Sequence, residues 1–313
     1  MATLRHVLLA SLLALGAVAS PRPVQGLTSH TAARSVADDH ASLATLQTRE
    51  EEKKKKKPKT PKYFHEPGGS LARAHYDARY FKDEVPYDEH RVVLRDLARS
   101  YLTVFAERGA ETWLSHGTLL GWWWNGQIMP WDYDLDMQIS YTTMQWLGDN
   151  LNRTEHAYNA TDDSTGEVRE KRYLLDVNPH HAEITRGDGM NIIDARWIDM
   201  ENGMFIDITG LREREQDRPG EWSCKNKHRY RTQDLWPMYV STFEGVKAKI
   251  PYSFQKILSD EYGDKSLVAE EWEGHRWDRD IKEWVKMSEE EEAARRRIAQ
   301  ERKKQDLEAQ GRL

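Results

Sequence analysis

The chain has 313 residues, of which 38% are hydrophobic, so it is long enough for one large domain or two small ones. Charged residues make up 31% of it, and the formal net charge is -6. Binding to nucleic acid phosphates needs a basic excess, so a nucleic acid partner is not expected. The single cysteine, Cys224, excludes an internal disulfide and is expected to be a plain buried side chain.

Residues 1–19 are predicted to be a secretory signal peptide. Arg5 and His6 precede an apolar run, and Ala17-Val18-Ala19 supplies small residues before a cleavage site near Ser20. The run is shorter than the roughly 20 residues that a membrane span needs, and an uncleaved signal anchor is the alternative. The signal therefore predicts a protein of the secretory pathway, either in the Golgi lumen or exported.

Residues 20–61 are predicted to be a disordered linker, because small and charged residues dominate them without periodicity and residues 53–57 are all lysine. We expect a folded catalytic domain over residues 62–287. A charged helical tail is expected over residues 288–313, where Ser288 and Glu291 give a capping-box pattern. Two Asn-x-Thr glycosylation acceptors, at Asn152 and Asn159, are expected on a surface loop.

The hydrophobic pattern predicts helices that alternate with strands. A helix from Tyr87 to Glu107, ended by Gly109, opens the domain. Asn202-Gly203 is a strong hairpin signal between two later strands. The order predicts an α+β domain with one mixed sheet, flanking helices and a cleft at strand ends. The other expected elements are a strand at 112–115, a helix at 118–124, a half-buried strand at 135–139, a helix at 142–151, and strands at 191–199 and 204–208.

Three aspartates, Asp132, Asp134 and Asp136, alternate along the chain, so in an extended backbone their carboxylates point to the same side. Their mutual repulsion calls for a hard divalent cation, Mg2+ or Mn2+. An EF-hand calcium loop is excluded, because the positions of its glycine and glutamate, counted from Asp132, hold Met137 and Thr143. The plainer alternative is that the aspartates decorate a turn or cap a helix.

A further acid, Asp207, lies within the apolar stretch "GMFIDITG" and needs a partner if it is buried. Together with Gly117-Thr118 and Asp134-Leu135-Asp136 it resembles the nucleotidyltransferase signature, in which a helix N-terminus accepts phosphate and acids hold metal ions. The stretch "HGTLLGWWWNGQIMPWDYDLDMQI" is more closely similar to the core motif of the LicD/fukutin-related family. "ARWIDMENGMFIDITGL" and "DLWPMYVSTFEGVKAKIPYSFQKILSDEYGD" resemble later segments of that family, so the resemblance spans residues 87–264.

The resemblance implies a nucleotidyltransferase-like mixed sheet. It also implies metal-dependent transfer of a phosphorylated sugar or alcohol from a nucleoside diphosphate donor onto a glycan. By the same resemblance, Asp134, Asp136 and Asp207 are catalytic and bind metal, Asp132 joins them as a metal ligand, and Gly117 and Thr118 form the phosphate-side turn of the donor site.

The spacer between these motifs departs from the bacterial form, because Trp124 stands where the family often has arginine. The Trp-rich spacer and the lysine and glutamate runs instead resemble the fungal Mnn4-type branch. That branch implies transfer of mannose phosphate from GDP-mannose to cell-wall mannan or to N- or O-linked glycans.

Basic residues are expected to face the transferred phosphates. Arg196, Lys227 and Arg229 are candidate donor-binding residues, and His228 is a candidate general base for the acceptor hydroxyl. A solvated loop is the alternative for residues 225–231. His180-His181 has no further ligand at metal-binding spacing and is expected to lie in a loop.

Trp122, Trp123 and Trp124 are predicted to wall the cleft beside the acids, and Trp131 to orient the acid strand and contact the donor. The alternative for at least two of the three is packing against the core, because consecutive helical residues point in different directions.

Two other functions fit the same motifs. An ordinary glycosyltransferase also holds metal and nucleotide sugar with Asp-x-Asp, but its acceptor attacks the anomeric carbon; the third acid and the Gly-Thr turn favour phosphoryl chemistry. A non-catalytic lumenal regulator would keep the fold and the acids and act through a partner transferase.

Overall fold

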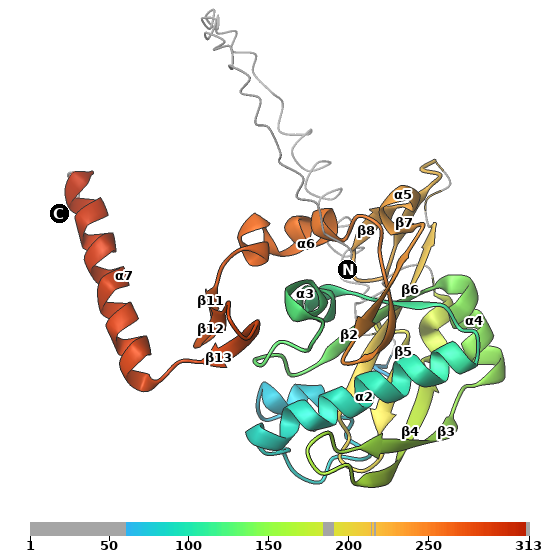
Figure 1. Cartoon of the computed structure of the whole chain (residues 1–313). Coiled ribbons are helices and arrows are strands. Elements are labelled where there is room, and N and C mark those ends of the chain that lie inside the picture. Colours follow the sequence, from blue (N-terminus) through green and yellow to red (C-terminus); the bar gives the residue numbers. More distant parts are fainter. Residues whose placement is uncertain (1–60, 184–190, 214, 216, 311–313) are drawn as a thin grey trace, which may run out of the picture. The chain divides into compact units, whose positions relative to one another are not determined.

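The computed structural model describes residues 61–183, 191–213, 215 and 217–310. They form an α+β fold in which helices flank a mixed sheet, and this confirms the predicted fold class (Figure 1). The predicted signal and nearly all of the predicted linker lie outside the described residues. Of the helices in these ranges, none is long and apolar enough to cross a membrane.

Within the described residues, the main sheet has eight strands in the order β1-β2-β6-β5-β4-β3, and β7 and β8 extend it from β6. β2 and β6 run parallel, whereas the other neighbouring strands are antiparallel. The strands are β1 (Thr112–Leu114), β2 (Leu135–Ser140), β3 (Thr154–Thr161), β4 (Val168–Val177), β5 (Ala195–Asp199), β6 (Phe205–Glu213), β7 (Glu221–Ser223) and β8 (Arg229–Arg231).

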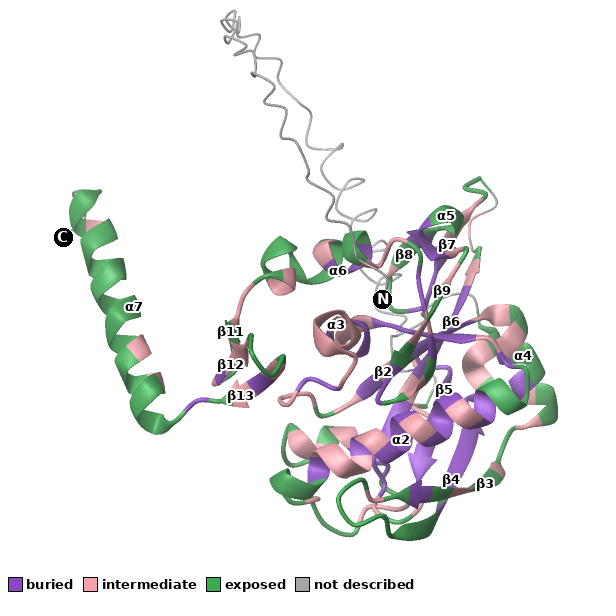
Figure 2. Cartoon of the chain, viewed as in Figure 1, coloured by how far each residue is buried: buried purple, intermediate pink, exposed green. Residues whose placement is uncertain are grey.

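Helix α2 (Tyr87–Glu107) has the bounds predicted from the sequence. Its apolar stripe is buried against the sheet, and the rings of Tyr101 and Phe105 each lie 6.1 Å from the ring of Trp197 on β5 (Figure 2). Gly109 follows with a left-handed φ of 67°, as expected of a residue that ends a helix. This helix therefore covers one face of the sheet.

The other predicted helices are also confirmed. Residues 118–124 lie in α3 (His116–Asn125) and residues 142–151 correspond to α4 (Tyr141–Asn150). His180-His181, expected in a loop, lies in a short 3-10 turn. The remaining helical elements are η1 (Ala72–His75), η2 (Pro179–Ala182), α5 (Thr232–Leu235), α6 (Phe254–Tyr262), η3 (Asp264–Leu267) and α7 (Glu289–Ala309).

The sequence predicted a half-buried strand at 135–139, and β2 departs from that pattern at one polar position. Gln138, at one of its alternating polar positions, is only 1% exposed. Its side-chain oxygen accepts from Nε1 of Trp113, and its amide nitrogen donates to the hydroxyl of Tyr230, each at 3.2 Å. Asp136, the other polar position within 135–139, is partly exposed, so the predicted half-buried pattern fails only at Gln138.

The hairpin of β3 and β4 was not predicted. It includes Asn159, whose side chain is exposed on edge strand β3, so the expectation of a surface loop was wrong for this residue. Asn152 precedes β3, and its side-chain oxygen accepts a hydrogen bond from the backbone of Val177 at 2.9 Å. Lys171 of β4 is buried between carboxylates, with Nζ 2.8 Å from Asp199.

The β5–β6 hairpin confirms the turn predicted at Asn202-Gly203. Gly203 has φ 90°, and a Cβ added to it would lie 2.9 Å from the backbone oxygen of Asp77. Only glycine fits this turn without strain. β5 begins later than expected, at Ala195, and β6 continues to Glu213.

Two smaller sheets complete the described part of the chain: β9 (Tyr239–Phe243) with β10 (Val246–Ile250), and β11 (Glu271–Trp272) with β12 (His275–Asp278) and β13 (Glu283–Lys286). The predicted capping box of Ser288 and Glu291 opens α7, which has no buried residue (Figure 2). Cys224 is fully buried, as expected.

Candidate functional site

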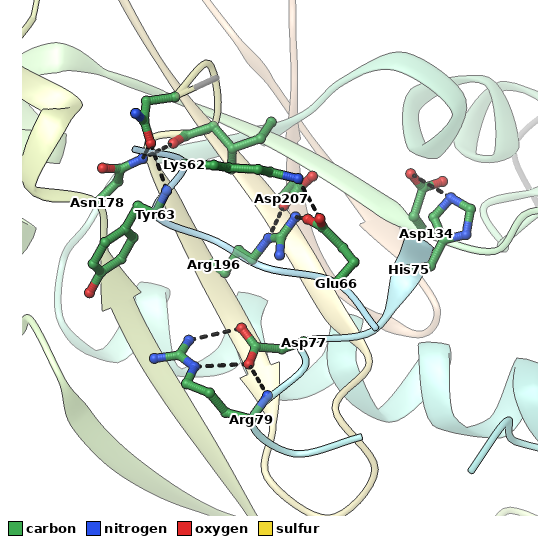
Figure 3. A network of polar contacts seen from close by, with 12 residues as sticks. Lys62, Tyr63, Glu66, His75, Asp77, Arg79, Asp134, Asn178, Arg196 and Asp207 are labelled. Carbon is green, nitrogen blue, oxygen red and sulfur yellow. Dashed lines mark hydrogen bonds and ion pairs between the residues drawn. The ribbon is translucent and has the colours of Figure 1, made fainter. Parts of the chain in front are cut away.

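Two neighbouring strands bring two of the four predicted acids together. Asp136 on β2 is the register partner of Asp207 on β6, and Arg196 on β5 is the partner of Asp207 on its other side. Register partners on adjacent strands point to the same face of a sheet. Trp197 packs on α2, so the acids lie on the opposite face, where Glu66 of the N-terminal segment meets Arg196 (Figure 3).

The start of α3 is hydrogen-bonded to strand β2, which carries Asp136. The hydroxyl of Thr118 accepts from the backbone N–H of Asp136 at 2.9 Å. A Cβ on Gly117 would lie 3.0 Å from Oδ2 of Asp132, so glycine allows that carboxylate to approach the helix. Asp134 lies between Asp132 and Asp136 in the sequence, and its Oδ2 is 3.7 Å from Nε2 of His75 (Figure 3). We refer to Asp132, Asp134, Asp136 and Asp207 as the acidic cluster.

Burial and nearby charges raise the pKa of three members of the acidic cluster, Asp132, Asp136 and Asp207. Burial and the charge of Asp134 raise the pKa of Asp132 to about 7. Burial raises the pKa of Asp136 well above its usual range, and the nearby acids reinforce the rise while His116 opposes it. Burial also raises the pKa of Asp207, against the effect of Arg196. These three carboxyl groups therefore bind protons more tightly than free aspartates do.

Arg196 lies at the site, but its charge is directed at carboxylates. Its Nε donates to Oδ1 of Asp207 and its Nη2 to Oε1 of Glu66, both at 2.7 Å (Figure 3). The guanidinium carbon is 3.6 Å from the ring centre of Phe205 and 4.7 Å from that of Phe64. With only 3% of its surface exposed, Arg196 holds the third acid in place.

The predicted basic cluster has other partners. Arg229 is exposed and contacts Glu215, with Nη2 2.8 Å from Oε1, and also Glu221. Lys227 is exposed in the turn between β7 and β8, with φ 71°. Lys225, by contrast, is buried and its Nζ lies 2.7 Å from Asp194. Lys227 and Arg229 are therefore solvated, as the alternative of a solvated loop expected, whereas Lys225 is not.

His228 meets two residues that the sequence did not single out, His116 and Glu261. Nδ1 of His116 is 2.5 Å from Oε1 of Glu261, and Nε2 of His228 is 4.0 Å from the same atom. Burial opposes a charge on His116, but the hydrogen bond to Glu261 and the nearby acids raise its pKa above 6.5. Burial and His116 lower the pKa of His228. The one sequence signal was the position of His116 directly before Gly117.

An aromatic cavity of about 970 Å³ opens beside the acids. Trp124 and Trp131 line it together with Asp132, Glu261 and Trp284 of β13. Trp131 packs edge-on against Trp284, with ring centres 4.9 Å apart.

The other two tryptophans of the triplet do not line this cavity. Trp122 and Trp123 pack against Phe254 of α6, with ring centres 5.0 and 5.7 Å apart, so they belong to the core. One tryptophan of the triplet meets the cavity, and the packing alternative accounts for the other two.

This arrangement, in which two acids face each other on parallel strands beside a Gly-Thr helix start, lies within residues 109–253. That range matches the family described as LicD/FKTN/FKRP, nucleotidyltransferase domain. Over this range the chain is similar to LicD-family domains. The fungal branch of the family is represented among the relatives of this chain.

Two yeast relatives and one animal relative illustrate the similarity. Mannosyltransferase regulator 4 of Saccharomyces cerevisiae is 36% identical over 157 residues, covering 48% of this chain and 13% of the relative. Mannosyltransferase regulator 14 of the same yeast is 35% identical over 123 residues, covering 39% and 12%. Ribitol 5-phosphate transferase FKRP of Mus musculus is 46% identical over 188 residues, covering 54% and 31%. The chain thus spans less than a third of each of these relatives.

The matched LicD range includes the acidic cluster, Arg196 and both histidines, but it ends before α6 and the β11–β13 sheet. Glu261 and Trp284 therefore lie beyond it. Walls of the aromatic cavity come from a part of the chain that the LicD match does not cover.

Proposed function

We propose that the LicD domain transfers a phosphorylated sugar or alcohol, most specifically mannose phosphate, from a nucleoside diphosphate donor onto a glycan. The observation that carries this proposal is the pairing of Asp136 with Asp207 on parallel strands, next to a helix start held by Thr118. The names of the relatives support it, because two refer to mannosyltransferase regulation and one to ribitol phosphate transfer.

The acidic cluster suits Mg2+ or Mn2+. All of its donor atoms are carboxylate oxygens, the ligands that these ions prefer. The raised pKa values of Asp132 and Asp136 reflect negative charges crowded together with little water, a state that a divalent cation relieves. Such an ion, when bound, neutralises charge on phosphate oxygens during displacement. We propose Asp132, Asp134, Asp136 and Asp207 as its ligands.

Other residues would bind and orient the substrates. Arg196 fixes the carboxylate of Asp207, while Gly117 and Thr118 present the helix start to a donor phosphate. The aromatic faces of the cavity suit a nucleobase or a sugar ring.

The acceptor hydroxyl must lose a proton during transfer. His228 is the proposed proton acceptor, because its lowered pKa keeps the ring neutral near pH 7.

The proposed setting is the secretory pathway, in the Golgi lumen or outside the cell. It follows from the predicted signal peptide and from relatives whose names concern mannosyltransferase regulation and ribitol 5-phosphate transfer. The acceptor would be a mannan or an N- or O-linked glycan. We further propose the division into a catalytic domain at residues 62–287 and a helical tail at 288–313.

A second function is a regulator that keeps the fold and acts through a partner transferase. The observation that favours it is the printed name of both yeast relatives, mannosyltransferase regulator. Such a protein would bind metal and donor without turnover.

The test is incubation of the purified chain with Mg2+ or Mn2+, a mannan oligosaccharide and, in separate reactions, GDP-mannose and CDP-alcohols. Mass spectrometry is expected to show a phosphodiester-linked mass gain and release of the mononucleotide. Asp134→Asn and Asp136→Asn should abolish the product, whereas Asp149→Asn, on an exposed position of α4, should not.

Two other outcomes would contradict the proposal. A plain hexose gain with release of the nucleoside diphosphate identifies a glycosyltransferase. Metal-dependent donor binding without product, in the presence of all acceptors, identifies the regulator.

A further inference from the structure

Three side chains with metal-ligating atoms meet beside the acidic cluster but do not belong to it. His116 begins α3, His228 lies in the turn between β7 and β8, and Glu261 lies on α6. One ligand atom from each lies within 4.8 Å of the others. The two imidazole rings are 4.3 Å apart between centres. Elements far apart in the chain thus bring three potential ligand atoms close enough together to bind one ion.

We infer that His116, His228 and Glu261 form a binding site for a divalent transition-metal ion, with Zn2+ the best match. Two imidazole nitrogens and one carboxylate, with a fourth position open, are a donor set that zinc takes. At bond lengths near 2.0–2.1 Å, tetrahedral ligand atoms lie roughly 3.3 Å apart. The distances of 2.5 Å and 4.0 Å to Oε1 of Glu261 bracket that value.

Buried neighbours limit the rotation of both rings. Nδ1 of His228 lies 3.4 Å from Sγ of the fully buried Cys224, and this contact leaves Nε2 directed at Glu261. Nε2 of His116 lies 3.4 Å from the amide nitrogen of the buried Gln138. Outer contacts of this kind orient histidine ligands in metal sites.

Backbone strain at the same place is a second, independent observation. His116 has φ 52°, and Lys227, directly before His228, has φ 71°. Residues with a Cβ rarely adopt this left-handed region, and such strain collects at functional sites. Here the strained residues set the directions from which both imidazoles approach Glu261.

The site differs in chemistry from the neighbouring acidic cluster. Imidazole nitrogens favour Zn2+ over Mg2+, whereas a cluster of carboxylates favours Mg2+. Zinc binding also displaces the proton shared by His116 and Glu261, so it should release a proton to the buffer.

This inference does not rest on the proposed transferase function, and its test measures binding alone. The zinc site and the proposed transfer reaction both use Nε2 of His228. An ion on Nε2 of His228 prevents that atom from accepting a proton, so Zn2+ is expected to inhibit any transfer that uses His228 as the base.

The test uses the full chain after EDTA treatment. Zn2+ affinity is measured by competition with a chromophoric chelator, and Co2+ binding by its visible absorption, which is strong for tetrahedral sites. We expect one Zn2+ per chain, no competition from excess Mg2+, and affinity losses of at least about tenfold in His228→Gln and Glu261→Gln.

Two controls separate this site from others. His180→Gln is the matched variant, because His180 pairs with Glu183 but has no third ligand among the described residues. Asp134→Asn removes a ligand of the acidic cluster only. His180→Gln should keep the zinc affinity and the cobalt spectrum of the unmodified chain. Asp134→Asn removes a negative charge near His116, so it should keep the cobalt spectrum while lowering the affinity by less than about tenfold.

The inference is overturned if His228→Gln and Glu261→Gln bind Zn2+ as tightly as the unmodified chain, if Asp134→Asn abolishes binding, or if no zinc binds. Circular dichroism of each metal-free variant establishes that it is folded. Should His116→Gln fail to fold, the His228 and Glu261 variants still decide the question.

Discussion

At the scale of single residues, the guanidinium of Arg196 shows how a charge predicted to bind substrate can serve the protein instead. Its hydrogen bonds go to Asp207 and Glu66, and two phenylalanine rings enclose it. A buried charge that loses its partner is strongly unfavourable, so Asp207 depends on this residue, whereas Glu66 also pairs with Lys62.

Arg196→Met is therefore expected to lower the free energy of unfolding by about 3–5 kcal/mol, because it leaves Asp207 without its cation and Glu66 with Lys62 alone. Urea unfolding followed by circular dichroism measures this. The matched control is Arg172→Met, since Arg172 pairs with Glu155 at the surface. Surface pairs contribute about 0–1 kcal/mol, so equal losses in the two variants would contradict the argument.

His90 predicts how stability depends on pH. It is 7% exposed beside Tyr133, and burial together with His75 lowers its pKa from 6.5 to about 4. Between these values the unfolded state binds the proton and the folded state does not. Stability is therefore lost as the pH falls from 6.5 towards 4, at up to about 1.4 kcal/mol per pH unit.

Unfolding of the metal-free chain at pH 7 and pH 5 checks this prediction. His90→Phe, which removes the titrating group, should reduce the loss of stability between the two pH values by roughly 2 kcal/mol. An unchanged pH dependence in the variant would show that other groups cause the loss.

At the scale of the elements, the β5–β6 hairpin places Asp207, and its turn depends on a glycine. Gly203→Ala meets both a left-handed backbone and the oxygen of Asp77 at 2.9 Å. Gly166→Ala meets the same backbone region, with φ 73°, and nothing within 4 Å.

Gly166→Ala should cost about 1–2 kcal/mol of stability, from the backbone alone. Gly203→Ala should cost about 1–3 kcal/mol more, because neighbouring backbone atoms must move. The difference between the two, measured by thermal unfolding, isolates the packing effect. Similar losses would mean that the hairpin yields easily to the added methyl group.

Sequence patterns predicted the elements whose signals are local. Helix α2 was predicted to the residue, because an apolar stripe runs between Pro86 and Gly109. The β3–β4 hairpin was missed because charged residues dominate the first half of β4, and ion pairs bury one of them, Lys171. A sequence window does not reveal that a lysine will be neutralised by residues from other strands.

The same distinction holds at the site. The alternating aspartates and the Gly-Thr turn could be recognised within one short stretch of the sequence, and the structure brings them together. His116, His228 and Glu261 come from three elements without shared spacing, so only the fold reveals their meeting. Likewise, nothing in the sequence around Arg196 indicates that Glu66 will accept a hydrogen bond from its guanidinium.

At the scale of the whole molecule, the C-terminal segments are expected to differ in importance. α7 has no buried residue, and its contacts with β11 and β12 are surface ion pairs such as Arg295 with Glu271. The β11–β13 sheet instead contributes Trp277 and Trp284, whose rings lie 5.0 and 4.8 Å from that of Trp124.

A chain that ends at Ser288 should thus unfold within a few degrees of the full chain in calorimetry, because surface pairs contribute about 0–1 kcal/mol each. A chain that ends at Glu270 should be clearly less stable, and its aromatic cavity should no longer bind the proposed nucleobase or sugar ring. Trp284→Ala in the full chain should reproduce part of both effects, by about 3–5 kcal/mol in stability. Equal stability of the two shortened chains would contradict this division.

The register of β2 against β6 has a consequence for the order of folding. Asp136 and Asp207 become neighbours only when a parallel pair closes across three intervening strands and helix α4, so this contact is among the slow, non-local ones. During synthesis the first acids leave the ribosome well before their partner strand exists. The ion that we propose for the acidic cluster would therefore bind late, after β2 and β6 have paired.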